Sequence, residues 1–359
     1  MNEYNPQIID NIPTTEEKEK AERRYLSFLE NSLEHFPISF KIGSVQYKGF
    51  SKDFTLTDTV TEGNVTRVTG LLCDTLTVMA EITDYTPHGY DAICWRVTFA
   101  NNTAAPSAHL SDLSALSMGY IGQEPVLTGI YGDGGVDESG AYAPYEFPLS
   151  GRNAKPIHME PDTGRGTYNY FPYFHLKNRQ GGLFIAMGWP IMWKADFTPD
   201  TVEVDDGTPV SCVRMDMGQA RFDAILQPGE SAIIPSVTLL HHTETDSDNA
   251  TNHWRHFFMD CIMRRVEGGL FPPHMSGGTS WLYAEMRDAT EDNQIDAMNK
   301  YLEHRIPIDY WWMDAGWYWK TPGVKLESWM ETGTWLVDTN RFPTEFAAIS
   351  EHGEKNGVK

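Results

Sequence analysis

The sequence is poor in cysteine, and the few cysteines that it has are spaced too widely to act together. The four are Cys73, Cys94, Cys212 and Cys261. No two of them form the C-x-x-C pair that is typical of zinc and redox sites, and a disulfide framework needs a denser set. We therefore expect buried free thiols, neither a disulfide framework nor a metal site.

Basic residues are also scarce, since 28 Lys and Arg stand against 50 Asp and Glu, for a formal net charge of −22. Binding to a nucleic acid requires clustered cations that neutralise phosphates, so this function is disfavoured. Binding to an anionic membrane surface is disfavoured for the same reason. An uncharged substrate fits the composition better.

Long apolar runs are absent as well. No stretch approaches the ~18 residues that a helix needs to span a bilayer. The first residues, "MNEYNPQIIDNIP", lack the basic and apolar regions of a signal peptide. The expected location of the protein is therefore the cytoplasm.

The chain does contain enough apolar residues for packed cores, with 40% hydrophobic and 12% aromatic residues. At 359 residues it should hold two or three domains, because single cores stop growing near about 250 to 300 residues. Near the N-terminus, Thr14-x-x-Glu17 is a capping-box pattern, and Leu26 and Leu29 follow at helical spacing. We expect a lead-in helix within residues 1–37.

Residues 38–250 are typical of an all-β domain. Short runs rich in Val, Ile, Thr and aromatic residues, such as "NVTRVTGLL", "LTVMAEITDY" and "AICWRVTFANN", alternate with clusters of turn residues such as "QPGES". Residues 251–277 then combine an amphipathic helix, "NHWRHFFMDCIMRRV", with a loop, "EGGLFPPHMSGG". We interpret the first segment as a large β-sandwich and the second as a linker.

Residues 278–359 follow a different pattern, in which candidate strands and helices alternate. The strands are "TSWLYAEM" and "IPIDYWWMDAG", and the helices are "ATEDNQIDAMNKYLEHRI" and "PTEFAAISEHGEKNG". This order predicts βα units on a parallel sheet, either a barrel or a doubly wound sheet. A (β/α)8 barrel takes about 250 residues and only about 80 follow the linker, so we expect an incomplete catalytic domain.

The aromatic run "YWWMDAGWYWK" at 310–320 is the strongest functional candidate. Alternate side chains of a strand face opposite ways, so Trp312 and Asp314 should share a face, opposite Trp311 and Met313. Asp314 falls at the carboxyl end of the expected strand, where βα folds carry their sites. A carboxylate there can accept hydrogen bonds from sugar hydroxyls while indole rings cover sugar C–H groups. The alternative is that the rings pack the core and Asp314 caps the next element.

Other candidates are weaker. Glu285 and Asp288 lie near the end of the first expected strand and could reach the same site, although a helix start there explains them equally well. Trp281 could lie near the start of the first expected strand, but packing in the core explains it at least equally well. We interpret three further features as structural, namely the acidic Gly-rich turn "YGDGGVDESG", the incomplete calcium-loop pattern "DSDNATN", and the pair His241 and His242.

Several segments, taken in order, resemble glycoside hydrolase family 36, the α-galactosidases. They are "YFPYFHLKNRQGGLFIAMGWPIMWKADF" (170–197), "LQPGESAIIPSVTLLHH" (226–242), "HWRHFFMDCIMRR", the stretch from "TSWLYAEM" to "WWMDAGWYW", and "GTWLVDTNRFPTEF" (333–346). The resemblance implies an N-terminal β-supersandwich followed by the start of a (β/α)8 barrel. It also implies a retaining reaction that uses two Asp residues and needs no metal or other cofactor. Both catalytic Asp residues are expected beyond Lys359, so we expect this chain by itself to be inactive.

The resemblance carries substrate binding over to residues of this chain. The family's second barrel strand usually ends in Asp-Asp-Gly-Trp, and here it reads Asp314-Ala315-Gly316-Trp317. Asp314, Trp317 and Trp335 are the expected contacts, with Trp312 on the strand face beside them. Because Ala315 replaces a carboxylate, the sugar is either galactose or a relative such as N-acetylgalactosamine or a pentopyranose. A galactosyl transferase and a non-catalytic carbohydrate-binding module remain as alternatives, and a homo-oligomer of the full-length protein remains open.

Overall fold

The structure is a computed structural model in which residues 36–50, 53–133, 140–161, 163–189, 191–203, 207–266, 269–270, 274–279, 288–319 and 335–359 are described. The chain divides into two compact units, Met1–Met263 and Arg264–Lys359. The expected lead-in helix and the turn "YGDGGVDESG", apart from its ends, lie outside the described residues, as does most of the expected strand "TSWLYAEM".

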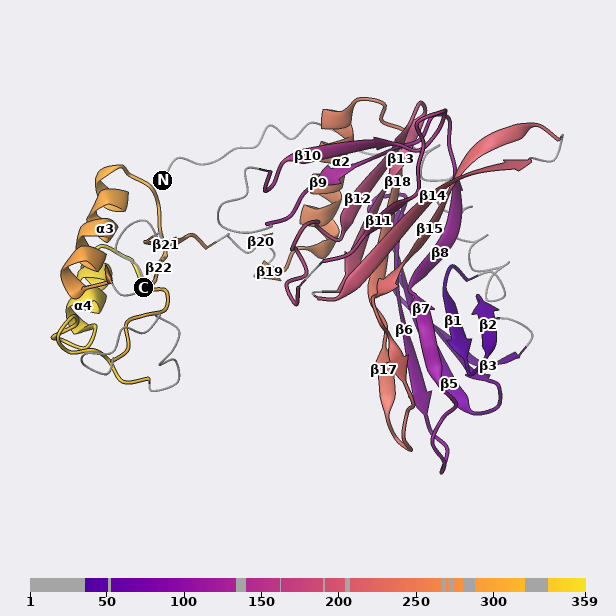
Figure 1. The fold of residues 1–359 in the computed structure, drawn as a ribbon, viewed down its shortest axis with the longest axis horizontal. Helices are drawn as coiled ribbons and strands as arrows, with labels where there is room; N and C mark the ends of the chain where they lie inside the picture. The colour runs from indigo at the N-terminus through magenta and orange to yellow at the C-terminus, as the bar shows by residue number, and fades with distance from the viewer. Residues whose placement is uncertain are drawn as a thin grey trace. The chain divides into compact units, whose positions relative to one another are not determined.

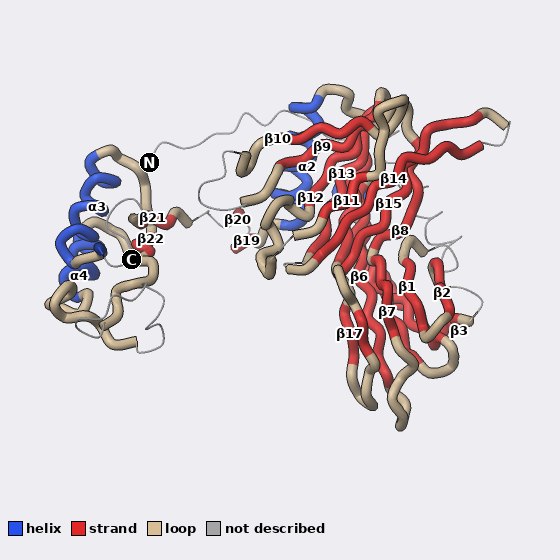
Figure 2. The backbone as a smooth tube through the Cα atoms, in the orientation of Figure 1, coloured by secondary structure: helices blue, strands red, loops and turns tan. Residues whose placement is uncertain are grey.

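The first unit is built from antiparallel sheets, as the alternating runs predicted (Figures 1 and 2). The largest sheet has the order β10-β9-β12-β13-β18-β6-β5-β4-β3, with β17 also paired to β6, and two four-stranded sheets have the orders β16-β7-β1-β2 and β11-β14-β15-β8. Their bounds are β1 Ser39–Ile42, β2 Val45–Lys48, β3 Phe54–Glu62, β4 Val65–Leu72, β5 Leu76–Asp84, β6 Ala92–Asn101, β7 Leu110–Ser114, β8 Leu116–Ile121, β9 Val126–Ile130, β10 Pro144–Pro148, β11 Ile157–Met159, β12 Tyr173–Asn178, β13 Gly181–Gly188, β14 Trp193–Glu203, β15 Pro209–Gln219, β16 Asp223–Ala224, β17 Ser231–Ile233 and β18 Ser236–His242. A short 3₁₀ turn, η1, spans Thr86–His88.

The main core lies between the large sheet and the two smaller ones. Along β5, every second residue from Leu76 to Asp84 is buried, and Val78 and Ile82 are 1% exposed. Trp95 of β6 is fully buried, and its indole N–H donates to the carbonyl of Ala115 at 2.9 Å. Ala115 separates β7 from β8, so this bond fixes the chain where it passes from one small sheet to the other.

A helix covers the opposite face of the large sheet. Helix α2, Ser247–Phe257, begins at Asp246, whose side chain accepts hydrogen bonds from the backbone N–H groups of Asp248 and Asn249. Its buried residues Ala250 and Phe257 pack against residues of β6, β13 and β18, and a π-helical turn, η2 Phe258–Ile262, follows. The helix was predicted over 252–266, whereas α2 begins at Ser247, inside the "DSDNATN" segment, and gives way to the π-helical turn at Phe258.

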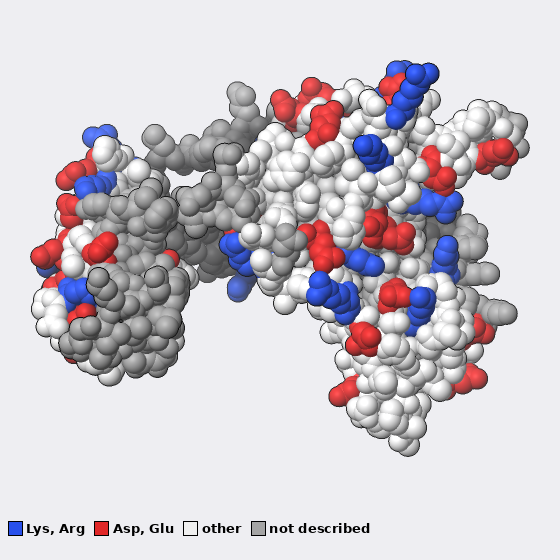
Figure 3. Space-filling model, in the orientation of Figure 1, with Lys and Arg blue, Asp and Glu red and all other residues white. Residues whose placement is uncertain are grey.

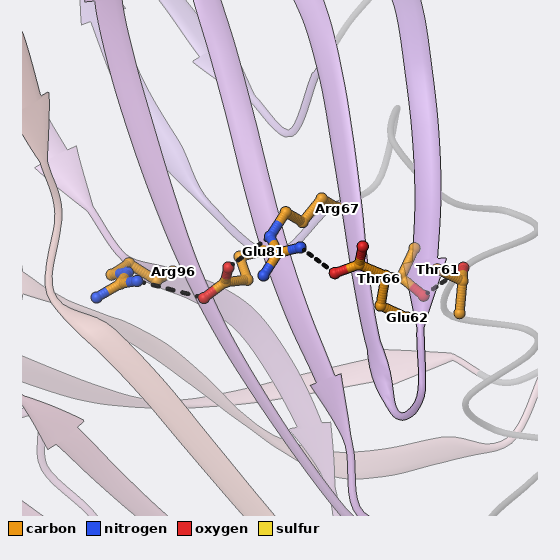
Figure 4. Close-up of polar contacts among 6 residues, drawn as sticks. All are labelled: Thr61, Glu62, Thr66, Arg67, Glu81 and Arg96. Atoms are coloured by element: carbon orange, nitrogen blue, oxygen red, sulfur yellow. Dashed lines mark hydrogen bonds and ion pairs between the residues drawn. The ribbon is translucent and has the colours of Figure 1, made fainter.

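Charged side chains form a row across the outward face of β3 to β6 (Figure 4). Arg67 lies directly opposite Glu81, and Glu81 lies directly opposite Arg96, in consecutive strand pairs. The carboxylate of Glu81 forms ion pairs with Arg67 at 2.9 Å and with Arg96 at 3.2 Å. Arg67 forms a second ion pair, with Glu62, at 2.9 Å. Opposite charges at facing positions stabilise neighbouring strands, so the row supports the register of this sheet.

We expect Glu81→Gln to lower the melting temperature by about 1 to 3 °C at low salt, because Arg67 and Arg96, on the strands at either side of β5, lose the carboxylate that they share. In 1 M NaCl the loss should shrink to less than about 1 °C, because the Debye length falls to about 3 Å. Calorimetry at both salt concentrations measures the effect. Glu62→Gln, which removes an outer member of the row, is the control, and an equal loss in both variants would contradict the bridging role of Glu81.

The second unit contains short strands and two helices. Its elements are β19 Arg265–Val266, β20 Gly269–Leu270, β21 Ser276–Gly278, α3 Glu291–Glu303, β22 Tyr310–Trp312 and α4 Ala347–Lys355. Thr290 caps α3 through a capping box with Asn293, as the predicted helix start requires. Ser276–Gly278 was expected as the end of the linker, but it pairs with β22.

No helix among the described residues is both long and apolar enough to cross a membrane. On the drawn face of the molecule, Lys and Arg side chains are interspersed with Asp and Glu (Figure 3), so the described part of that face carries no continuous basic patch.

Candidate functional site

Strand β22 separates the aromatic run into a buried side and an exposed side. Trp311 and Met313 pack against the core of the second unit, which includes Met298, Phe342 and Ile349. Tyr310 is 37% and Trp312 is 70% exposed, and Asp314 is exposed on the same side. The predicted alternation therefore holds from Tyr310 to Asp314, and the aromatic run serves both packing and surface.

Trp311 belongs to the core. Its indole N–H donates to Oε1 of Gln294 at 3.2 Å, and Gln294 is fully buried in α3. The ring of Tyr301, also from α3, meets Trp311 edge-on at 5.9 Å between centroids. These contacts place α3 against one face of β22 and leave the face that carries Trp312 and Asp314 uncovered by α3.

The backbone around β22 forms a parallel ladder. β21 and β22 pair in parallel, with Ser276 opposite Tyr310 and Gly278 opposite Trp312. On the other side, the backbone N–H of Lys359 donates to the carbonyl of Asp309, and that of Trp311 donates to the carbonyl of Lys359, both at 2.8 Å. One residue bonding to both neighbours of its partner is the pattern of a parallel pair. Three parallel segments thus follow one another, connected through α3 and α4.

The turn after β22 holds two of the predicted binding residues, Asp314 and Trp317. Asp314 Oδ1 accepts the backbone N–H of Ala315 at 2.6 Å, and Gly316 adopts a φ of 98°, which favours glycine. Trp317 is half-buried, and its ring lies 6.0 Å from that of Trp335, which is 63% exposed. The structure therefore brings Trp317 and Trp335 together, although they are far apart in the sequence.

A half-buried arginine, Arg341, holds this turn in place. Arg341 forms an ion pair with Asp338 at 2.8 Å, and the two side chains are 15% and 12% exposed. Its guanidinium also donates to the carbonyls of Ala289 at 3.0 Å, Gly316 at 2.6 Å and Tyr318 at 3.2 Å. One side chain thereby connects the turn after β22 with the residues just before α3.

The pKa of Asp338 shows which effect dominates at this position. Burial by itself would raise the pKa of the carboxyl group. The hydrogen bond and charge of Arg341, together with the N–H of Asn340, outweigh burial and lower the pKa below its usual value. Asp338 is therefore a stable anionic partner for Arg341 at neutral pH.

The remaining sequence candidates are less informative. Trp281 and Glu285 lie outside the described residues. Asp288 is exposed, and its backbone carbonyl accepts a hydrogen bond from the Asn293 side chain at 2.6 Å, which fits the helix-start interpretation. In the described part of the chain the four cysteines form no disulfide bond, and Cys212 is buried while the others are half-buried. In the part of the chain that the structure describes, no group of three or more His, Cys, Asp or Glu side chains is arranged to hold a metal ion.

Sequence reasoning missed the role of Arg341 and Asp338. The signal was present as an acidic and a basic residue three positions apart in "DTNRFP", directly before α4. Nothing in this spacing indicates that the arginine reaches back to Gly316 and Tyr318, because those contacts span more than twenty residues of chain.

No protein-family model and no curated protein matches the chain by sequence. Among solved structures, it is similar to the family 36 α-galactosidase AgaA from Geobacillus stearothermophilus, at 14% identity and a TM-score of 0.63, covering 90% of this chain and 45% of the enzyme. It is similarly related to the galactosidase domain of AgaSK, an α-galactosidase-sucrose kinase, at 15% identity, with a TM-score of 0.63 and 90% and 44% coverage. A third match is an α-galactosidase from Lactobacillus brevis, at 13% identity, with a TM-score of 0.62 and 90% and 43% coverage.

These likenesses show a shared fold, and they confirm at that level the resemblance found in the sequence. The chain spans less than half of the length of each matched structure. A variant of the Geobacillus enzyme, similar to this chain with a TM-score of 0.60, was crystallised with stachyose.

Proposed function

We propose that this chain forms the N-terminal part of an α-galactosidase-like retaining glycoside hydrolase. In this proposal residues 38–250 form the β-supersandwich and residues 278–359 form the first two βα units of a (β/α)8 barrel. Residues 1–37 are the lead-in helix, and residues 251–277 are the linker. The observation that carries the proposal is the parallel ladder, because it puts Asp314 just after the carboxyl end of β22. Sites of βα barrels lie at that end of the strands.

In this function, Asp314 and the indole rings bind the sugar. The exposed carboxylate of Asp314 accepts hydrogen bonds from two neighbouring hydroxyls, and such charge-assisted bonds are stronger than neutral ones. Trp317 and Trp335 offer ring faces to the apolar side of a pyranose, and Trp312 extends this surface along the strand. Ala315 leaves room where a second carboxylate would stand, which favours a sugar with a different substituent, such as N-acetylgalactosamine, or a pentopyranose.

The bond-breaking steps require two further carboxyl groups. One carboxylate attacks the anomeric carbon while a carboxylic acid protonates the departing glycosidic oxygen, and water then releases the sugar from the enzyme. We assign neither role to a residue between Met1 and Lys359. The contribution of this chain to catalysis is therefore the binding and orientation of the sugar.

The role of Asp314 predicts that Asp314→Ala weakens saccharide binding by about 10- to 100-fold, because hydrogen bonds to a charged group each contribute about 1.5 to 3 kcal/mol. Isothermal calorimetry with methyl α-galactoside and methyl α-N-acetylgalactosaminide measures the effect and compares the two sugars. Asp296→Ala is the matched control, because it removes an exposed carboxylate that pairs with Lys300 on the surface of α3.

Equal affinities for Asp314→Ala and Asp296→Ala would contradict the binding role. Release of p-nitrophenol from an α-galactoside by residues 1–359 alone would contradict the assignment of catalysis to other carboxyl groups. Transfer of the sugar to an added saccharide by a longer product of the same gene would indicate a transferase. Binding without bond cleavage by that product would indicate a carbohydrate-binding module.

A further inference from the structure

A cavity of about 350 Å³ lies within the first unit, at one end of the space between the large sheet and the sheet that ends in β8. We propose that it is a second saccharide-binding site, which takes one uncharged pyranose unit. Its lining comes from β5, β6, β8, β12, β13, β18 and the turns beside them, and comprises Asp84, Thr86, Asp91, Ala92, Ile93, Met118, Tyr120, Ile121, Asn178, Gln180, Leu183, Leu239 and His241.

The cavity follows from the unequal widths of the sheets. β8 is the edge strand of a four-stranded sheet, whereas the sheet facing it has ten strands. Near the ends of β18 and β6, inward-facing residues of the large sheet are therefore not covered by β8. Ile121, at the end of β8, is 54% exposed, and Gln180, in the turn between β12 and β13, is exposed, so these two mark the opening.

The floor of the cavity is apolar. Leu183 and Leu239 are 4% and 8% exposed and belong to the main core. Met118, Tyr120 and Ile93 are half-buried and pack against that core. A flat aromatic ring beside aliphatic side chains suits the C–H face of a pyranose, which needs an apolar surface of limited size.

The walls carry fixed polar groups. His241 Nδ1 and Asp91 Oδ2 are 3.1 Å apart, and both side chains are 26% exposed. Asn178 donates to the hydroxyl of Tyr120 at 3.0 Å and accepts the backbone N–H of Gln180 at 2.7 Å, so its amide is held in one orientation. Ordered polar groups over an apolar floor are typical of small-molecule sites.

The charges in the lining select the class of ligand. Asp84 and Asp91 contribute carboxylates, and no Lys or Arg is among the lining residues that the structure describes. An anionic ligand would face these carboxylates without a cation to offset them. A wholly apolar ligand would cover the Asp91–His241 pair and the Asn178 amide without replacing their hydrogen bonds with water, which is costly. An uncharged, hydroxyl-bearing ring meets both requirements.

This inference is independent of the proposed function, because the cavity and Asp314 belong to different compact units. The whole chain carrying Asp314→Ala is therefore the background for the test, and raffinose is the probe. Methyl-¹³C methionine NMR reports on the cavity through Met118, whose resonance is assigned with Met118→Leu. We expect a saturable shift of this resonance with raffinose and with galactose, but an affinity at least about tenfold lower for galacturonate.

Two variants test whether the polar residues that line the cavity bind the saccharide. Asn178→Ala should weaken the binding that Met118 reports by about tenfold, because one hydrogen bond is lost and the Tyr120 ring is released. Gln180→Ala, at the exposed rim, should weaken it about two- to threefold and does not threaten folding. The dispersion of the other methionine resonances shows whether each variant is folded.

Two results would overturn the inference: a Met118 resonance that raffinose does not move, or one whose response is unchanged in both folded variants. Galacturonate binding as tightly as galactose would overturn the choice of an uncharged ligand. If the Met118 response persists while Asp314→Ala leaves the total heat of saccharide binding unchanged, the inference stands and the proposed function fails.

Discussion

Replacing Arg341 with methionine should lower the stability of the second compact unit by about 3 to 5 kcal/mol, the usual cost of removing one partner of a buried ion pair. The substitution leaves Asp338 as a buried charge without its cation, and it removes hydrogen bonds from three backbone carbonyls. Methionine keeps a similar length and adds no polar atom. The loss therefore reports the missing ion pair and hydrogen bonds more than a missing volume.

Hydrogen exchange of the amides in α3 and α4 measures this prediction within the second unit. We expect protection in both helices to fall by about two to four orders of magnitude, which corresponds to the expected loss of stability. Arg341→Lys should give an intermediate loss, because an ammonium retains the charge but cannot reproduce the planar fork of donors. Lys300→Met, which breaks an exposed pair with Asp296, is the control and should leave protection almost unchanged. Equal protection in Arg341→Met and Lys300→Met would contradict the role of Arg341.

The same substitution should affect the proposed sugar site. Arg341 holds the carbonyls of Gly316 and Tyr318, which flank Trp317, so its loss frees the turn that carries this ring. Saccharide affinity should then fall even where the unit remains folded. This consequence rests on the proposed function, whereas the loss of protection does not.

The second large effect is acid destabilisation of the first unit through a buried histidine pair. Nε2 of His175 in β12 lies 2.9 Å from Nε2 of His242 in β18, and the two residues are 6% and 5% exposed. One ring must donate its proton to the other, so the pair holds a single proton at this contact. The ring of Phe184 stacks on His175 at 4.0 Å, and Gly182 leaves the space that the pair occupies, since a Cβ there would lie 2.8 Å from Nε2 of His242.

Both histidines resist protonation in the folded chain. Burial is the main cause that lowers the pKa of His175 to about 3, and His242 and Lys177 lower it further. Burial also lowers the pKa of His242 to about 4, with contributions from His241 and His253. A second proton would put two positive charges in contact inside the sheet, which is unfavourable in a medium of low dielectric constant.

The direction of the pH effect follows from these pKa values. In the unfolded chain both groups have a pKa near the ordinary 6.5, so below that pH the unfolded state binds more protons than the folded state. The stabilisation is fully present above pH 6.5 and is lost as the pH falls towards the folded pKa values. Between pH 7 and pH 5 the two groups should together remove about 2 to 4 kcal/mol of unfolding free energy.

Urea denaturation followed by circular dichroism at pH 7, 6 and 5 measures this loss. The double variant His175→Gln/His242→Gln keeps a hydrogen-bonding pair that does not titrate, so its stability should change much less over the same range. Similar pH slopes in the parent chain and in a folded double variant would show that other groups govern the acid response.

Much of the fold could be predicted from local pattern. Runs rich in Val, Ile, Thr and aromatic residues predicted the strands β5 and β6, and the segment "ATEDNQIDAMNKYLEHRI" predicted the helix α3. Patterns of this kind predict the structure because each depends only on residues within one element or in neighbouring elements. The strand at Ser276–Gly278 was not predicted, since two glycines and a serine carry no strand propensity, and its pairing with β22 comes from the parallel register.

The candidate site was predicted in part. The alternation of side chains correctly separated Trp311 from Trp312 and Asp314, but it could not show that Trp335 returns to lie beside Trp317. The partners of Arg341 and of His242 could not be predicted either, because these contacts join segments that are distant in the chain. Whether the parallel segments continue into a closed barrel, and whether Asp314, Trp312, Trp317 and Trp335 bind a sugar, stay predictions.

The sequence by itself determined that a large part of this chain forms antiparallel strands, and that a carboxylate follows an aromatic strand, because propensity and periodicity act over a few residues. Only the tertiary structure decided which of those aromatics are core and which are surface. It also decided that Arg341 forms hydrogen bonds with the turn after Asp314. In the first unit it decided that His175 and His242 form a buried hydrogen bond, and that a cavity with polar walls lies beside the core. Those features depend on side chains that meet after the chain has folded back on itself, and the free energy of such contacts is set by burial and partners rather than by position in the chain.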